Sequence, residues 1–313
     1  MKVIDLYCGA GGLSLGFVQE GFKMVKAIDI DPWAVETYNR NIANVAECRD
    51  IREVDPDELP DADGIIGGPP CQSFSIAGRR IKEIIKQENR KIRKYFEREE
   101  VAKNDPRSNL SIIFVEIVKR KKPEWFVMEN VDGLINLSFR NVLEHLIKKA
   151  GYFLEEPFVL DAVHYGVPQF RKRLFFIGFL DGRKPLFFPT PLPSQEWKTV
   201  RQALPDYEYE WYYRHPRTYG RRAVFSVHEP SPTIRTVNRP MPPNYKRHPR
   251  DAPYIDGQVR ALTADERAIL QAFPKDFHFH CESKTEKEKL IGDAVPPKLA
   301  RVVARVIKNT VNF

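Results

Sequence analysis

The stretch Gly64-Ile-Ile-Gly-Gly-Pro-Pro-Cys-Gln-Ser-Phe-Ser75 decides how the rest of this chain is interpreted. Its β-branched Ile65 and Ile66 predict a short buried strand. The glycines and prolines that follow end this strand in a rigid turn, which leaves Cys71 where a sheet meets solvent. An exposed thiol is a candidate nucleophile when its pKa is lowered or when a substrate accepts its attack. A buried free cysteine is the common alternative, but the prolines and polar neighbours of Cys71 favour the exposed position.

Strand and helix signals alternate on both sides of this stretch. Short apolar runs predict strands, and apolar residues at helical spacing predict the helices between them. Repeated β-α-β units predict an α/β protein whose mostly parallel sheet is covered on both faces. The predicted strands are Val3–Tyr7, Met24–Ile30, Gly64–Gly67, Trp125–Met128 and Leu174–Phe179, and the predicted helices are Leu13–Glu20, Pro32–Asn41, 110–118, 142–147, 263–273 and 298–307.

Two regions break this alternation. Residues 79–103 are dense in Lys, Arg and Glu, which is typical of a solvated helix or loop. From about Lys184 to Ala252, periodicity disappears and prolines, aromatics and arginines crowd together, which predicts a smaller domain of loops and short strands. Arginines and tyrosines suit contacts to phosphates and bases, but aromatics also build small cores. We place the smaller domain at residues 184–281 and the main domain at 1–183 and 282–313.

Composition narrows the class of protein. The 313 residues carry a formal net charge of +8, which allows a polyanionic partner without proving one. No apolar run approaches the roughly 20 residues that span a bilayer, and a strand-like start predicts that a signal peptide is absent, so we expect a cytoplasmic protein. The four cysteines are scattered without a C-x-x-C pair, which argues against a structural zinc site and a disulfide framework.

A glycine-rich turn and an acidic strand end predict a cofactor site. The segment Asp5-Leu-Tyr-Cys-Gly-Ala-Gly-Gly12 lies between the first predicted strand and helix, where a ligand can approach backbone amides. Asp29 ends the second predicted strand and is placed to accept hydrogen bonds from ribose hydroxyls. Together they predict an adenosine-containing cofactor. Ser14 stands where the last glycine of a G-x-G-x-x-G turn would fall, which disfavours a nicotinamide cofactor.

One acid is predicted to lie near Cys71, and two arginines are predicted to share one side of the chain. Glu129 follows a strand that ends at Met128, so its carboxylate is expected at the same edge of the sheet as the thiol. Taken singly, Glu129 is more typical of a helix-capping or salt-bridging surface acid. Arg171 and Arg173 alternate along the chain and therefore point to one side, which suits an anion or a carboxylate-lined pocket.

These segments, in this order and over nearly the whole chain, resemble the DNA (cytosine-5)-methyltransferase family of prokaryotic restriction-modification type. Any one motif arises by chance, but an ordered series is specific. The motifs that carry the resemblance are Asp5–Gly12, the acidic end of the second strand, Gly68-Pro-Pro-Cys-Gln72, Arg107-Ser-Asn-Leu110, Glu129-Asn-Val131, Gln169-x-Arg-x-Arg173, Arg260-x-Leu-Thr263 with Glu266 and Phe273-Pro274, and Gly292-Asp-Ala-Val-Pro296.

The resemblance implies both a fold and a reaction. The fold is a Rossmann-like S-adenosylmethionine-dependent methyltransferase domain with a smaller target-recognition domain. Cys71 attacks C6 of a cytosine so that C5 becomes nucleophilic, Glu129 contacts N3 and the exocyclic amine, and Arg171 and Arg173 orient the base and the carboxylate. Loss of the C5 proton then expels the cysteine. Because C5 and C6 are inaccessible in a stacked duplex, the cytosine is flipped into the pocket.

The resemblance also implies the ligands and the residues that bind them. The cofactor is S-adenosylmethionine, with S-adenosylhomocysteine as product and no metal. Asp29 stands where the family more often has Glu, and Asp293 stands where it usually has Asn, which adds a negative charge near the cofactor. The implied cofactor-binding residues are Tyr7, Gly9, Ala10, Gly11, Gly12, Asp29, Ile30, Asp50, Ile51, Pro70, Leu110, Asp293 and Ala294, and the implied DNA-binding residues are Gln72, Ser73, Ser75, Thr233 and Arg235.

The expected partner is double-stranded DNA, and the enzyme is expected to be a monomer associated with the nucleoid of a prokaryote. A separately acting cognate restriction endonuclease is an expectation at the level of the family. Three alternatives stay open. A tRNA substrate is disfavoured because the Cys-Phe-Thr run of that branch is absent. A catalytically silent DNA-binding regulator is disfavoured by the intact Cys71, Glu129 and Arg173, and a nicotinamide-dependent oxidoreductase gives Cys71 no role.

Overall fold

An eight-stranded sheet forms the centre of the larger part of the molecule. The computed structural model describes residues 1–70, 110–136, 138–182, 186–216 and 220–311. Within these residues the strand order is β3-β2-β1-β4-β5-β8-β6, and β7 pairs with β8. The strands are β1 (Lys2–Leu6), β2 (Lys23–Asp29), β3 (Ala46–Cys48), β4 (Gly64–Gly67), β5 (Trp125–Val131), β6 (Phe153–Leu154), β7 (Phe158–Asp161) and β8 (Lys172–Phe179).

The sheet is parallel from β3 to β5 and antiparallel beyond it. β1 pairs in parallel with β2 and β4, and β4 pairs in parallel with β5. β8 runs antiparallel to β5, with Val131 opposite Arg173 and Glu129 opposite Phe175. The predicted α/β fold with a mostly parallel sheet is confirmed, and β6, β7 and β8 supply its antiparallel part.

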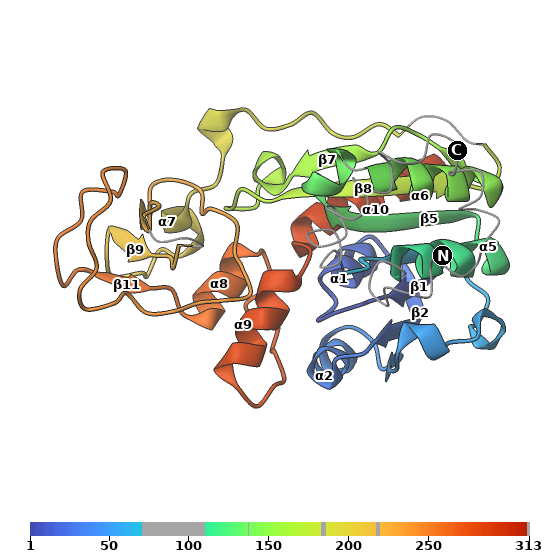
Figure 1. The fold of residues 1–313 in the computed structure, drawn as a ribbon, viewed down its shortest axis with the longest axis horizontal. Coiled ribbons are helices and arrows are strands. Elements are labelled where there is room, and N and C mark those ends of the chain that lie inside the picture. The colour runs from blue at the N-terminus through green and yellow to red at the C-terminus, as the bar shows by residue number, and fades with distance from the viewer. Residues whose placement is uncertain (71–109, 137, 183–185, 217–219, 312–313) are drawn as a thin grey trace, which may run out of the picture.

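Helices cover both faces of this sheet (Figure 1). Alternate strand residues face opposite layers. Val3, Ile66 and Val127 pack with one pair of helices, whereas their neighbours Ile4, Ile65 and Phe126 pack with the other. The first pair is α1 (Gly12–Gln19) and α10 (Pro297–Val311), and the second is α5 (Leu110–Lys121) and α6 (Ser138–Lys149).

A second, three-stranded sheet lies to one side of the first (Figure 1). Its order is β10-β9-β11, with β10 antiparallel and β11 parallel to β9. Its apolar cluster extends into the helices next to it and reaches Ile291 in α9. The elements of this part are α7 (Val200–Ala203), β9 (Trp211–Tyr213), β10 (Val224–Ser226), β11 (Val259–Ala261), α8 (Ala264–Leu270) and α9 (Lys284–Asp293).

The remaining helices connect these elements. α2 (Pro32–Asn41) follows β2, with Asp31 as its N-cap and, as the sequence predicts, a proline in its first turn. Short 3₁₀ helices are found at Ile51–Glu53, Pro56–Glu58, Asp132–Asn136, Ala162–Tyr165 and Ser194–Glu196. None of the helices in the described ranges is long and apolar enough to cross a membrane.

Candidate active site

The turn between β1 and α1 requires its glycines. Gly9 and Gly11 have φ angles of +53° and +87°, which side-chain-bearing residues rarely adopt. A Cβ on Gly12 would lie 2.3 Å from the carbonyl oxygen of Val295, whereas nothing lies within 4 Å of a Cβ on Gly9. The turn therefore packs closely against the chain that follows α9 and leaves open space above Gly9. Such space permits a ligand to approach main-chain amides.

Asp29 is held beside this turn by two main-chain amides. The amide of Gly9 donates to Asp29 Oδ2 at 2.8 Å, and the amide of Asp31 donates to Asp29 Oδ1 at 2.9 Å. Burial raises the pKa of Asp29, and these two hydrogen bonds oppose that shift. Because each carboxylate oxygen has a second lone pair, Asp29 can still accept hydrogen bonds from the hydroxyls of a ribose.

The residues predicted to surround an adenine lie just after the ends of β2 and β3. Ile30 is 65% exposed, an unusual position for a large apolar side chain, whereas Ile51 is buried. The Asp50 carboxylate accepts a hydrogen bond from Arg52 Nε at 2.9 Å, and this contact lowers the pKa of Asp50. The hydroxyl of Tyr7 donates to the carbonyl oxygen of Leu110 at 2.7 Å.

The last two predicted cofactor residues follow α9. Asp293 ends this helix and Ala294 follows it, directly before the Val295 carbonyl that packs on the glycine turn. Desolvation raises the pKa of Asp293, and the positive charges of Lys289 and Arg171 oppose the shift. Ala10 is buried in the turn itself, and Pro70 is exposed at the end of the segment that follows β4.

Glu129 and Arg173 form a buried ion pair. Since Arg173 lies opposite Val131 in the antiparallel pair, Glu129 is its diagonal neighbour on the same face. Arg173 Nε lies 2.7 Å from Glu129 Oε1, and both side chains are almost entirely buried. Burial raises the pKa of Glu129, whereas Arg173 and Arg171 oppose the shift. The result is a carboxyl group that takes up a proton more readily than an exposed glutamate.

The segment that leads to Cys71 contacts the strand of this acid. The side-chain amide of Asn130 donates to the carbonyl oxygen of Pro69 at 3.0 Å. A Cβ on Gly68 would lie 2.9 Å from Glu129 Oε2, so the chain passes directly over the carboxylate. Cys71, and the predicted DNA-binding residues Gln72, Ser73 and Ser75, lie outside the described residues.

Arg171 is buried and donates to main-chain carbonyls. Its guanidinium donates to the carbonyl oxygens of Ile234 at 2.8 Å, Gly292 at 2.7 Å and Ala294 at 2.9 Å. Burial lowers the pKa of Arg171, and the like charge of Arg173 adds to this effect. Arg171 thus joins the predicted cofactor residues after α9 to the segment that contains Thr233 and Arg235.

That segment is fixed from both sides. Thr233 Oγ1 donates to the carbonyl oxygen of Phe170 at 2.7 Å, and Arg214 donates to the carbonyl oxygen of Thr233 at 2.6 Å. Arg235 in turn donates to the carbonyl oxygen of His215. Burial and the neighbouring Arg235 lower the pKa of Arg214 to about 10, as expected for cations that lie close together.

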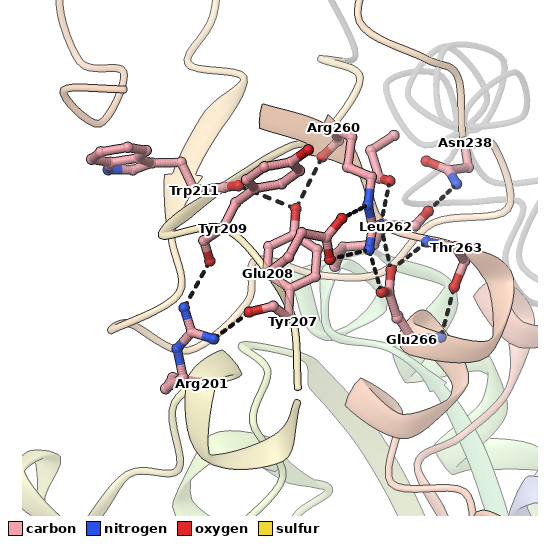
Figure 2. A network of polar contacts seen from close by, with 11 residues as sticks. Arg201, Tyr207, Glu208, Tyr209, Trp211, Asn238, Arg260, Leu262, Thr263 and Glu266 are labelled. Atoms are coloured by element: carbon pink, nitrogen blue, oxygen red, sulfur yellow. Dashed lines mark hydrogen bonds and ion pairs between the residues drawn. The ribbon is translucent and has the colours of Figure 1, made fainter. Parts of the chain in front are cut away.

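A polar network stiffens the small sheet behind this segment. Figure 2 shows Arg260 between two carboxylates, with Nε 2.7 Å from Glu208 and Nη2 2.7 Å from Glu266. Its guanidinium also lies 4.6 Å from the centre of the Tyr207 ring. Glu266 completes a capping box with Thr263 at the start of α8. The predicted motif Arg260-x-Leu-Thr263 therefore joins β11 to α8.

Sequence analysis missed three residues that contact the predicted site. Gln271 donates to the carbonyl oxygen of Ile291 at 2.6 Å, and Lys289 lies 2.6 Å from Asp31. For Asp31 the signal was present, because an acid before proline is typical of a helix N-cap. For Gln271 and Lys289 the sequence carries no local signal, since their partners are distant in the chain. No cluster of metal-ligating side chains is found among the described residues.

Comparisons with known proteins agree with this geometry. A family model described as C-5 cytosine-specific DNA methylase matches residues 1–233 and 212–309. The chain belongs to this family. It is therefore a DNA (cytosine-5)-methyltransferase, and the family implies S-adenosylmethionine as methyl donor. Two relatives are Type II methyltransferases: M.HgiDI of Herpetosiphon aurantiacus, 38% identical over 100% of this chain and 96% of its own, and M.HindV of Haemophilus influenzae, 39% identical over 99% and 97%.

Solved structures with the same fold are more distant in sequence. A putative DNA modification methyltransferase encoded in an Escherichia coli prophage has a TM-score of 0.70 at 23% identity and covers 100% of both chains. The Dnmt2 methyltransferase of S. pombe has a TM-score of 0.71 at 20% identity, again over 100% of both chains. The family match and the Type II relatives together indicate that the present chain is a methyltransferase of restriction-modification type.

Proposed function

We propose that this methyltransferase modifies C5 of a flipped cytosine within a specific double-stranded DNA sequence, through a covalent bond between Cys71 and C6. The observation that supports this best is the buried Glu129–Arg173 pair under the Gly68-Pro69 segment, directly before Cys71. A thiolate is suited to this chemistry because it is both a good nucleophile and a good leaving group.

Each residue has one task in this proposal. The Cys71 thiolate forms a bond to C6, and the electron pair of the C5–C6 double bond moves to make C5 nucleophilic. Glu129, whose pKa is raised by burial, donates a hydrogen bond to N3 and accepts one from the exocyclic amine, while Arg173 fixes the carboxyl group. After methylation a base removes the C5 proton, and the thiolate leaves from C6.

The cofactor residues fit an adenosine-containing methyl donor. The open space above Gly9, the hydroxyl-accepting Asp29 and the exposed Ile30 suit an amino acid carboxylate, a ribose and an adenine respectively. When bound, S-adenosylmethionine supplies an electrophilic methyl group and leaves as S-adenosylhomocysteine. We assign the remaining predicted residues, from Tyr7 to Ala294, to the same site.

The wider assignments complete the proposal. Residues 1–183 and 282–313 form the catalytic domain and 184–281 the target-recognition domain, with Thr233 and Arg235 near the DNA. The enzyme acts as a monomer in the nucleoid of a prokaryote, and a cognate restriction endonuclease acts separately. Arg171 orients the carboxylate site through the carbonyls that it binds rather than by direct contact with the base.

Methyl transfer to DNA tests the proposal. The chain is incubated with tritiated S-adenosylmethionine and unmethylated duplex DNA, and the label is located by digestion to nucleosides. We expect label in 5-methylcytosine, its loss in Cys71→Ser, and its retention in the control Cys281→Ser, because Cys281 is a free cysteine that contacts Phe279 and is not among the assigned site residues. Glu129→Gln should lower kcat by about 10²-fold or more, as for loss of a group that moves or shares a proton.

Other results of this methyl-transfer assay would contradict specific parts of the proposed function. Label in tRNA and none in DNA would overturn the substrate. Label in neither, with DNA binding intact, would favour a silent binding protein. Normal turnover by Cys71→Ser would overturn the covalent route while leaving the reaction in place.

A further inference from the structure

Lys289 reaches from α9 to the start of α2. Its Nζ lies 2.6 Å from Asp31 Oδ2, although the two residues are 258 positions apart in the chain. Asp31 also caps α2, since its Oδ1 accepts a hydrogen bond from the amide of Trp33 at 3.0 Å. The Asp31 side chain is therefore fixed by its own helix and by a cation from a distant helix.

Asp31 also forms a hydrogen bond with Asp29. The amide of Asp31 donates to Asp29 Oδ1 at 2.9 Å, while Gly9 donates to Oδ2 at 2.8 Å. A chain of direct contacts thus runs from Lys289 through Asp31 to the carboxyl group beside the glycine turn. Asp31 is thus held by Lys289 and carries one of the two amides that hold Asp29.

The positive charge of Lys289 lies among several carboxyl groups. Three carboxyl groups, those of Asp29, Asp31 and Asp293, lie near one another and near Lys289. Burial raises the pKa of Asp31, but the hydrogen bond and the charge of Lys289, together with the amides of Trp33 and Ala34, more than offset it, and the net shift is downward. The cation therefore limits repulsion among acids that border the cofactor residues.

We propose that Lys289 is a positioning residue for cofactor binding, which fixes Asp31 and, through the Asp31 amide, the carboxyl group that receives the ribose hydroxyls. This inference rests on the proposed function, because the role of Asp29 is part of it. Lys289 does not touch the cofactor in this proposal. Its effect belongs to the binding of S-adenosylmethionine and S-adenosylhomocysteine and leaves the chemistry at Cys71 unchanged.

The exposure of the Lys289–Asp31 pair sets the expected size of its effect on cofactor affinity. The Lys289 side chain is 54% exposed and that of Asp31 is 17% exposed, so the pair is partly screened by solvent. Pairs of this kind contribute up to about 1 kcal/mol, which corresponds to about a fivefold change in affinity. Lys289→Met should weaken the binding of both cofactor forms by about fivefold. Lys289→Arg, which keeps a donor and the charge, should retain most of the affinity.

Calorimetric titration of the full chain with S-adenosylhomocysteine tests this directly, because it needs neither DNA nor turnover. The matched control is Lys287→Met in the same helix, which removes an ion pair of the same 2.6 Å length to Asp265 and leaves Asp31 untouched. The control should bind normally. For Lys289→Met we expect an increased KM for S-adenosylmethionine with kcat unchanged at saturation, and a smaller difference from wild type at about 1 M salt.

The inference is overturned if Lys289→Met binds S-adenosylhomocysteine as the wild type does, if Lys287→Met loses as much affinity, or if kcat falls while KM stays constant. Failure of the wild-type chain to bind the product would overturn the proposed cofactor site together with the inference. Tight wild-type binding with an unaffected Lys289→Met variant would overturn the inference alone.

Discussion

Asp5 shows how a single carboxyl group responds to its place in the sheet. It is fully buried in β1, where the hydroxyl of Ser14 donates to its Oδ2 at 2.5 Å and the hydroxyl of Tyr38 donates to Ser14 at 2.9 Å. Its Oδ1 has no hydrogen-bond partner among the described residues. Burial raises the pKa of Asp5 to about 8, which the hydrogen bond from Ser14 only partly opposes. Asp5 is therefore largely protonated at neutral pH.

This shift has a consequence for stability. Between the ordinary pKa of an aspartate, near 4, and about 8, the folded chain holds a proton on Asp5 that the unfolded chain has lost. The contribution of Asp5 to stability is thus fully present below pH 4 and is lost as the pH rises toward 8. Asp5→Asn should remove this dependence, so that its free energy of unfolding decreases less than that of the wild type between pH 5 and pH 8.

Urea unfolding at several pH values measures the effect. The control is Asp61→Asn, since the Asp61 side chain is fully exposed. Parallel pH dependence of the wild type and Asp5→Asn would contradict a protonated Asp5.

At the scale of elements, the end of α9 depends on close backbone contact. A Cβ on Gly292 would lie 2.3 Å from the amide nitrogen of Thr236 and 2.4 Å from the carbonyl carbon of Arg235. Neither main-chain atom can turn away as a flexible side chain does. α9 therefore meets the segment that follows Ile234 at a distance that only glycine permits.

Gly292→Ala should accordingly destabilise the fold by about 1–3 kcal/mol, as overpacking of a tight contact does. It should also weaken cofactor binding, because Asp293 and Ala294 follow directly. Thermal unfolding with and without S-adenosylhomocysteine measures both effects. Gly133→Ala is the control, since nothing lies within 4 Å of a Cβ there. A variant Gly292→Ala with wild-type stability would show that the contact can relax.

The helices differ in how well the sequence predicts them. The range from about Pro32 through Asn41 is predicted with its observed bounds, because Pro32 marks its start. α9 was missed, since its first residues are almost all charged and give no apolar face. Its one local signal was the capping box of Ser283 and Glu286, which the structure contains. Local chemistry therefore predicts helix starts even where periodicity fails.

At the scale of the whole molecule, Arg171 connects its own segment to two others, one at Ile234 and one at the end of α9. Its guanidinium shares the carbonyl oxygen of Ala294 with Gln271, and it is the donor that reaches the buried carbonyl oxygens of Ile234 and Gly292. Arg171→Met should leave these acceptors unsatisfied and cost about 3 kcal/mol or more in the free energy of unfolding. Urea unfolding measures it, with Arg301→Ala as control, because the Arg301–Glu20 pair is half exposed and contributes at most about 1 kcal/mol.

A loss below 1 kcal/mol for Arg171→Met would indicate that water replaces the guanidinium and that the three segments are joined by other contacts.

Contacts between residues that are far apart in the sequence could not be predicted, whereas features with a local pattern could. Alternation of strands and helices predicts the parallel sheet and brings Tyr7, Asp29 and Glu129 to one edge, which the structure confirms. The small sheet was predicted only as loops and short strands, since its three-residue strands are too short to show a period. The antiparallel β8, the carbonyl partners of Arg171 and the Lys289–Asp31 pair follow from tertiary contacts that no local pattern records.

The packing of α10 on α1 bears on how the protein is made. Gly16 in α1 has no room for a Cβ, because the backbone of Ala300 and Arg301 lies within 2.6 Å of that position. Because α1 and α10 are far apart in the sequence, the ribosome synthesises α1 long before α10, and the apolar face of α1 lacks this partner until then. Until the end of α9 has been synthesised, the nascent chain also lacks Ala294 and Val295, which pack against Gly12 of the glycine turn. We expect chains truncated before α10 to bind S-adenosylmethionine poorly, so that methylation should require a chain in which α10 has already been synthesised.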